Sequence, residues 1–332
     1  MTGVRTLGDG QTRSAGVAVA WAHVRILVTN DDGVHAPGLA ALTRGLVAWA
    51  DAEVGDGPGP PHEIIVVAPS SNYSGASAAV GSVTDGMAIT YQRAVVDVAG
   101  SDEAYGLDAS PALSVIAGAL GAIGPKPDLV VSGINHGVNV GRSVLHSGTV
   151  GAALTASQLG ISALAVSLRA GPDPQPWESA AQLAVTLVPM LVRAPRRTVL
   201  NLNVPALPLG DIRGVRWARV GGAGLIRAAR GARWEAPNRP EMEGPAVAEA
   251  ARSVMEGDQE ERGEIVLTVG SPFPHSGQSG LADSADEDAT LVAQGFASLT
   301  ALAGPRGVED PSLLDQLDAA LEGALEGAGF SG

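Results

Sequence analysis

Two adjacent acids follow an apolar run near the start of the chain. The run covers residues 24–29 (Val-Arg-Ile-Leu-Val-Thr), and Asn30, Asp31, Asp32 and Gly33 come directly after it. Neighbouring carboxylates repel each other unless a positive partner lies between them, and a hard divalent cation prefers oxygen ligands. The same residue types are also common in a solvated turn or at a helix N-cap. The segment alone therefore leaves a metal site and a simple turn open.

Two more polar, glycine-rich segments follow apolar runs. Residues 69–77 (Pro-Ser-Ser-Asn-Tyr-Ser-Gly-Ala-Ser) come after the run 63–68, and residues 132–141 (Ser-Gly-Ile-Asn-His-Gly-Val-Asn-Val-Gly) come at the end of the run 128–132. In an open parallel sheet, ligands bind beyond the carboxyl ends of the strands. We therefore expect the three segments to converge on one edge of a sheet.

A helix is expected to begin within Ser-Gly-Thr-Val-Gly-Ala-Ala, residues 147–153. Free backbone N–H groups and the helix dipole favour an anion such as phosphate at this position. Simple N-capping by Ser147 or Thr149 is the alternative. An acid-and-amide metal site beside an anion-binding helix start is an arrangement suited to metal-assisted hydrolysis of a phosphate ester.

Apolar strands that alternate with helical patterns must position these segments. Continuous apolar strands separated by helices predict a parallel sheet covered on both faces, that is, an α/β fold with a Rossmann-like three-layer core. The expected strands are 24–29, 63–68, 128–132, 161–167 and 198–203, a hairpin is possible within 79–99, and the expected helices are 37–50, 110–120, 149–159 and 177–192.

The pattern divides the chain into three parts. Residues 1–23 are expected to be a disordered N-terminal extension, and residues 24–205 to form the α/β core. Residues 206–332 are expected to be an irregular extension that mediates oligomerisation, with strands at 264–269 and 297–301 and a terminal leucine-faced helix at 311–325.

Composition excludes several classes of protein. The net charge of −14 argues against general nucleic-acid binding, which needs a basic face. The absence of cysteine removes disulfides and thiolate metal sites and fits a cytoplasmic location. No apolar run is long enough to span a membrane. A dinucleotide-dependent oxidoreductase is disfavoured because acids, not Gly-x-Gly-x-x-Gly, follow the first strand.

Four motifs in order resemble the SurE survival protein family of divalent-metal-dependent 5′/3′-nucleotidases. They are residues 25–38, 67–77, 127–141 and 147–153, and Asn-Leu-Asn-Val-Pro at 201–205 also fits. The resemblance implies hydrolysis of nucleoside 5′- and 3′-monophosphates by a metal-activated water. It also implies one divalent ion, Mg²⁺ or Mn²⁺, and a homodimer or homotetramer.

The site residues are carried over from the matching positions. The resemblance implies that the metal ligands are Asp31, Asp32, Ser74 and Asn135, and that one of the two acids orients or deprotonates the attacking water. Phosphate binding is expected at Asn30, Ser147, Gly148 and Thr149, from the helix-start argument as much as from the resemblance.

The chain departs from the family pattern at two positions. Leu113 stands where the family has an acid, which motivates a non-catalytic metal- and nucleotide-binding oligomer as the alternative function. His146 stands where the family usually has tyrosine. The loop residues that could reach the pocket, or could equally be structural, are His35, His136, His146 and Arg142. The arginines between 213 and 233 could face a nucleotide or form a solvated face.

Overall fold

The computed structural model describes residues 23–54, 62–94, 103–222, 226–231, 265–269 and 284–305. The expected N-terminal extension, apart from His23, and the expected terminal helix at 311–325 lie outside these residues. No helix within the described ranges combines the length and the apolar character needed to cross a lipid bilayer.

A nine-stranded sheet forms the centre of the fold, in the order β3-β4-β2-β1-β5-β6-β7-β11-β8. Its central strands are parallel, whereas β3 pairs antiparallel with β4 and β11 pairs antiparallel with β7. The strands are β1 (Arg25–Thr29), β2 (Glu63–Pro69), β3 (Tyr91–Arg93), β4 (Glu103–Leu107), β5 (Leu129–His136), β6 (Ser162–Leu168), β7 (Val199–Val204), β8 (Val215–Trp217) and β11 (Ala297–Leu302). A separate two-stranded sheet pairs β9 (Ile226–Gly231) with β10 (Ile265–Val269).

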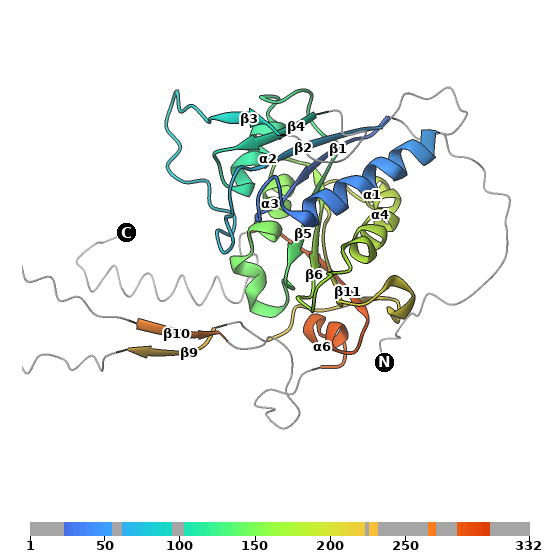
Figure 1. The fold of residues 1–332 in the computed structure, drawn as a ribbon. Helices are drawn as coiled ribbons and strands as arrows, with labels where there is room; N and C mark the ends of the chain where they lie inside the picture. The colour runs from blue at the N-terminus through green and yellow to red at the C-terminus, as the bar shows by residue number, and fades with distance from the viewer. Residues whose placement is uncertain are drawn as a thin grey trace, which may run out of the picture.

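Helices cover both faces of the sheet (Figure 1). On one face lie α1 (Pro37–Val54) and α4 (Trp177–Arg193), and on the other lie α2 (Pro111–Ala119) and α3 (Gly148–Gln158). Successive residues of a strand point to opposite faces, so in β1 the side chains of Ile26 and Val28 join the α1–α4 core and that of Leu27 joins the α2–α3 core. The expected three-layer α/β fold is confirmed.

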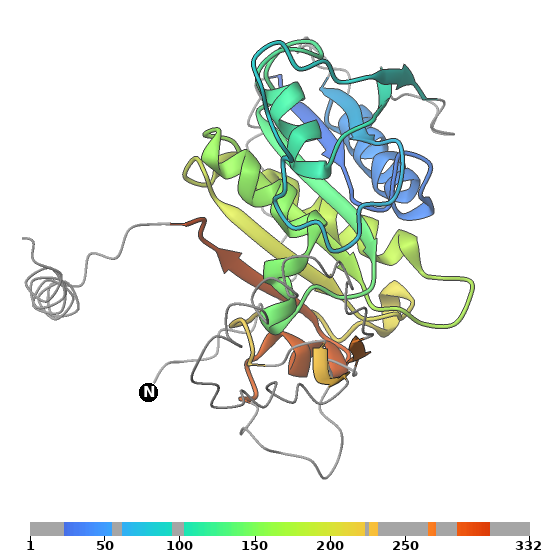
Figure 2. The same ribbon diagram turned by 90° about the vertical axis from the view of Figure 1, so that its left-hand side faces the viewer.

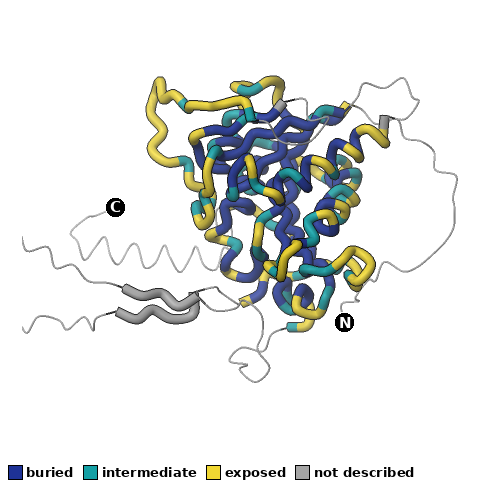
Figure 3. The backbone as a smooth tube through the Cα atoms, viewed as in Figure 1, coloured by how far each residue is buried: buried dark blue, intermediate teal, exposed yellow. Residues whose placement is uncertain are grey.

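Burial follows this layering. The strands that carry the site are almost entirely buried, and the outer sides of the helices and the segment between β2 and β3 are exposed (Figure 3). Such strands are apolar along their whole length because both of their faces are covered, which is why they lack the alternating pattern of a half-exposed sheet.

The sheet continues beyond residue 205, where the core was expected to end. The strand β11 lies alongside β7 (Figure 2), and β8 pairs with β11. The short helix α6 (Asp288–Ala293) precedes β11. The division at residue 205 stays a prediction, but it separates strands that belong to one sheet.

Candidate active site

The strand order of the sheet reverses direction at β1, which makes the gap between β1 and β5 the topological switch point. From β1 the chain moves outward on one side through β2 and β4, and it returns on the other side of β1 through β5, β6 and β7. In such a sheet the carboxyl ends of the two strands at the switch point diverge and leave a crevice where ligands bind. Asp31 follows β1 directly and Asn135 lies near the end of β5, so both predicted ligands lie at this crevice.

A tight turn holds the two acids at the end of β1. The amide of Asn30 is fully buried; its Nδ2 donates to the carbonyl of Gly33 at 2.9 Å, and its Oδ1 accepts from the N–H of Gly33 at 3.2 Å. Gly33 has φ of +106°, a conformation that side chains with a Cβ rarely adopt. The Asn30 side chain therefore fixes the turn that projects Asp31 and Asp32.

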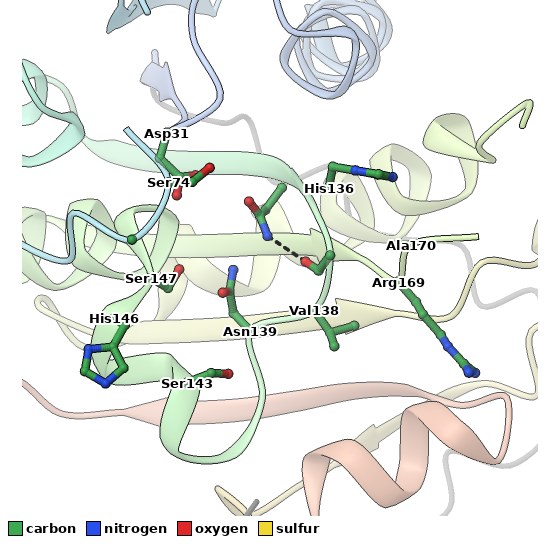
Figure 4. A pocket seen from close by; sticks show the side chains of 13 residues that line it. Asp31, Ser74, His136, Val138, Asn139, Ser143, His146, Ser147, Arg169 and Ala170 are labelled. Carbon is green, nitrogen blue, oxygen red and sulfur yellow. Dashed lines mark hydrogen bonds between the residues drawn. The ribbon is translucent and has the colours of Figure 1, made fainter. Parts of the chain in front are cut away.

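The segment after β2 is tied to the same turn. The N–H of Tyr73 donates to the carbonyl of Asp31 at 2.7 Å, and the N–H of Ser74 donates to Oδ1 of Asn72 at 2.7 Å. Nδ2 of Asn72 lies 3.5 Å from Oδ1 of Asp32. These contacts bring the oxygens of Ser74 and Asp31 side by side at one end of the site (Figure 4).

The end of β5 supplies the third segment. The backbone N–H of His136 donates to Oδ2 of Asp32 at 3.3 Å. Nδ2 of Asn135 donates to the carbonyl of Gly137 at 2.6 Å, which leaves the Oδ1 of Asn135 as the group that can act as a ligand. The three segments that the sequence predicted to converge do converge.

The start of α3 abuts Asp31. Ser147 is the N-cap, and its Oγ accepts from the N–H of Val150 at 3.1 Å. The hydroxyl of Thr149 donates a short hydrogen bond to Oδ1 of Asp31. A Cβ on Gly148 would lie 2.8 Å from Oδ2 of Asp31, so only glycine lets the helix approach the carboxylate this closely.

These segments enclose a cleft of about 410 Å³. Asp31 and Ser74 lie at one end and Arg169 at the other, and the imidazole of His136 points away from Asp31 (Figure 4), toward the ring of Trp177, with 5.8 Å between the ring centroids. The described lining residues are Asp31, Ser74, Gly75, Asn135, His136, Gly137, Val138, Asn139, Ser143, His146, Ser147, Arg169 and Ala170.

Both acids have a raised pKa. Burial raises the pKa of Asp31, and repulsion by Asp32 raises it further, while the hydrogen bond from Thr149 opposes the shift. Burial also raises the pKa of Asp32, against the N–H and the charge of His136. A divalent cation between the carboxylates would offset both the burial and the repulsion.

The donors available are those that hard cations prefer. The two carboxylates, the Ser74 hydroxyl and the Asn135 amide supply only oxygen, as Mg²⁺ or Mn²⁺ requires. Within the described ranges no group of three or more His, Cys, Asp or Glu side chains could hold a metal ion. A metal site here must therefore combine the two acids with neutral oxygens, as the sequence predicts.

Some of the predicted site residues line the cleft, and the others hold those lining residues in place. Asp31, Ser74, Asn135 and Ser147 line the cleft. Asp32 lies beside it, bonded to His136 and Asn72. The side chain of Asn30 closes the turn, Thr149 is fully buried against Asp31, and Gly148 provides the close approach.

Sequence reasoning missed part of the wall. Asn139 belongs to the motif segment 127–141, and Ser143 lies between that motif and the one at 147–153. Arg169 and Ala170 follow β6, another parallel strand whose carboxyl end was not considered. Asn139 is held by a buried network: its N–H donates to Oδ1 of Asn203 at 2.7 Å, and its Nδ2 donates to the Ser167 hydroxyl at 2.8 Å.

The remaining polar candidates fall into two groups. His136 and His146 line the cleft, while His35 and Arg142 are exposed and are not among its described lining residues. Leu113, at the family departure, packs against the apolar α2–α3 core and not in the cleft.

Three of the arginines beyond residue 212 have structural partners. The guanidinium groups of Arg213 and Arg216 stack on the ring of Phe296, and Arg219 forms an ion pair with Asp286 at 2.9 Å. The expected nucleotide-facing patch thus stays a prediction for the others.

Comparisons with known proteins agree with this geometry. The sequence model of the family described as Survival protein SurE matches residues 26–225. The proteins named 5′/3′-nucleotidase SurE from Cronobacter sakazakii and Klebsiella pneumoniae are 40% and 39% identical over 200 residues, which cover 60% of this chain and 70% of each relative. The crystal structure of the SurE protein from Aquifex aeolicus superposes with a TM-score of 0.60 at 25% identity, covering 90% of this chain and 99% of that one.

Proposed function

Because the chain belongs to the survival protein SurE family, we propose that it is a divalent-metal-dependent phosphomonoesterase that hydrolyses nucleoside 5′- and 3′-monophosphates to nucleoside and phosphate. The convergence of Asp31, Ser74 and Asn135 on one cleft carries the proposal. The relatives named 5′/3′-nucleotidase make the general class a hydrolase acting on nucleotides. The cleft volume of about 410 Å³ falls in the range of about 300–1,000 Å³ for small-molecule sites.

The metal ligands in this proposal are Asp31, Asp32, Ser74 and Asn135. When bound, one Mg²⁺ or Mn²⁺ ion supplies Lewis-acid polarisation of a phosphoryl oxygen and lowers the pKa of a water. Asp31 and Asp32 contribute the negative charge, and the Ser74 hydroxyl and the Asn135 carbonyl contribute neutral oxygens. The hydrogen bonds from Thr149 and from the His136 N–H hold each carboxylate in one orientation.

The phosphate is held, in our proposal, at the start of α3. Ser147 lines the cleft there, and the positive end of the helix dipole favours the negative charge that grows on the phosphoryl oxygens. Asn30 and Thr149 act indirectly, since their hydrogen-bonding groups face the acid turn and Asp31. The far end of the cleft, with Arg169, is left for the nucleoside.

Phosphate release from 5′-AMP and 3′-AMP tests the proposal. Hydrolysis should require Mg²⁺ or Mn²⁺, stop on exhaustive chelation, and be lost in Asp31→Asn, which keeps the shape of the side chain but removes its charge. Asp211→Asn, which neutralises an exposed acid, is the control and should retain full activity.

Phosphate release, combined with calorimetry, distinguishes the hydrolase from the alternative, a non-catalytic binding protein. A protein that binds Mn²⁺ and 5′-AMP in calorimetry but releases no phosphate over hours would be the non-catalytic binder and would end the hydrolase proposal. The packing of Leu113 against the apolar α2–α3 core, and not in the cleft, supports the catalytic version. The homodimer or homotetramer and the cytoplasmic location stay predictions.

A further inference from the structure

The C-terminal part of the chain reaches the cleft wall through the carboxylate of Asp288, the first residue of α6. Asp288 is fully buried. Its Oδ2 accepts from the N–H of Gly141 at 2.9 Å, and its Oδ1 accepts from the N–H groups of Gly221 and Ala289 at 3.1 and 2.8 Å. One side chain thus joins three segments that are far apart in the sequence.

A carboxylate is the group that suits this position. Its two oxygens accept up to four hydrogen bonds, and bonds to an ionised acceptor are about twice as strong as neutral ones. A buried charge is costly unless such bonds compensate it, so the three N–H groups are needed to keep Asp288 in place. Gly221 allows the contact, because a Cβ there would lie only 3.2 Å from Oδ1 of Asp288.

The segment that Asp288 holds is a wall of the cleft. Gly141 begins the 3₁₀ helix η1 (Gly141–His146), which leads directly to Ser147 at the start of α3. The residues just before it, Val138 and Val140, pack against Ala289 and Val292 of α6. Val138, Asn139, Ser143, His146 and Ser147 of this segment all line the cleft.

Three of the four proposed metal ligands lie outside the segment that Asp288 holds; the fourth, Asn135, lies just before it and donates to the carbonyl of Gly137. Asp31, Asp32 and Ser74 lie on the segments after β1 and β2, and their orientation is set by Tyr73, Asn72 and Thr149. A change at Asp288 should therefore disturb chiefly the wall that faces the substrate, while the cation keeps the carboxylates of Asp31 and Asp32 and the hydroxyl of Ser74.

We propose that Asp288 is a positioning residue for substrate binding: by holding the N–H of Gly141 it fixes residues 137–147 as the wall that contacts the nucleotide. This inference rests on the proposed function in assuming that the occupant of the cleft is a nucleoside monophosphate. It gives the C-terminal part of the chain a role inside the catalytic unit.

The test compares Asp288→Asn with Asp286→Asn. Both changes neutralise an acid at the start of α6, but Asp286 is exposed and pairs with Arg219. In Asp288→Asn the amide has one acceptor oxygen and turns an N–H₂ group toward a backbone N–H. We expect a rise of about tenfold in KM for 5′-AMP, a kcat within about threefold, and an unchanged Mn²⁺ concentration for half-activation. Asp286→Asn should keep the KM of the unmodified protein.

Hydrogen exchange gives a readout that needs no activity. In Asp288→Asn, without nucleotide, the amides of residues 137–147 should exchange at least about tenfold faster, while those of residues 30–34 and 70–77 keep their rates. Unchanged exchange at 137–147, or an equal effect of Asp286→Asn, would overturn the proposal. A loss of kcat and of Mn²⁺ affinity with KM unchanged would overturn it as well.

Two further outcomes are distinguishable. If the unmodified protein hydrolyses no mononucleotide, the proposed function fails, and the exchange data alone decide the role of Asp288 in holding the wall. If Asp288→Asn does not fold, Gly221→Ala replaces it. Its Cβ would lie 3.2 Å from Oδ1 of Asp288, besides 2.8 Å from Oε2 of Glu287, and should give smaller changes in the same direction; unchanged exchange would refute the proposal.

Discussion

The contact between Gly148 and Asp31 allows a quantitative test of the site. In Gly148→Ala the new Cβ would lie 2.7 Å from the Cβ of Asp31 and 2.8 Å from its Oδ2. Carbon atoms in ordinary contact lie about 3.5–4.0 Å apart, so the helix start and the carboxylate must separate by about 1 Å. A displacement of about 1 Å at a catalytic group costs about 10²-fold in rate.

Stability should change much less than activity. Overpacking lowers the free energy of unfolding by about 1–3 kcal/mol, and the preference of a helix for alanine over glycine raises it by about 1 kcal/mol. We therefore expect Gly148→Ala to be folded, with a kcat/KM for 5′-AMP that is about 10²-fold lower in a phosphate-release assay. The control is Gly210→Ala, which adds the same atom where no other atom lies within 4 Å. A kcat/KM for Gly148→Ala within about threefold of the control would refute our account of the site.

Two pH-dependent effects are expected from buried titratable groups. In the metal-free protein Asp31→Asn should raise the melting temperature at pH 7, because burial raises the pKa of Asp31 and its charged form is unfavourable there; the gain should shrink as the pH falls and the carboxyl takes up its proton, and a gain that is constant with pH would contradict this. Burial lowers the pKa of His62, whose Nδ1 accepts from the N–H of Val24 at 3.2 Å. The unfolded chain therefore takes up this proton first as pH falls below about 6.5, so stability should decline from pH 7 to pH 5. His62→Gln should flatten that decline in urea titrations, and an equally steep decline would exclude His62 as its source.

The position of the acid turn could be predicted from sequence because its cause is local. A buried apolar strand that stops at Asn30 must turn there, and the switch-point rule places Asp31 and Asp32 at the crevice. The same rule, applied to the strands expected to end at residues 68 and 132, predicted the convergence that Ser74 and Asn135 show.

The helix start at residue 147 shows where local reasoning stops. Its position was predicted correctly, and its preference for an anion stays a prediction. Thr149, however, donates its hydroxyl to Asp31, so the nearest anion to the helix start is a carboxylate of the chain itself. Only the packing of α3 against the β1 turn reveals this, and that packing depends on glycine at position 148.

The strands predicted at 264–269 and 297–301 are present as β10 and β11, whereas the short strands β8 and β4 and the contact of Asp288 were beyond sequence reasoning for another reason. The strands β8 and β4 are short and carry polar residues, and pairing with β11 and β2 determines their conformation. The bond from Gly141 to Asp288 spans 147 residues of sequence, and no periodicity predicts a contact over that separation.

The antiparallel pairing of β11 with β7 has a consequence for synthesis of the protein. Until β11 leaves the ribosome, the hydrogen-bonding edge of β7 has no partner in the sheet, and Asp288 is not yet available. At about 5–20 residues per second, the roughly 100 residues between the two strands keep that edge open for about 5–20 s. An open edge of this kind can pair with another chain, so nascent copies on neighbouring ribosomes are most vulnerable to association in this interval.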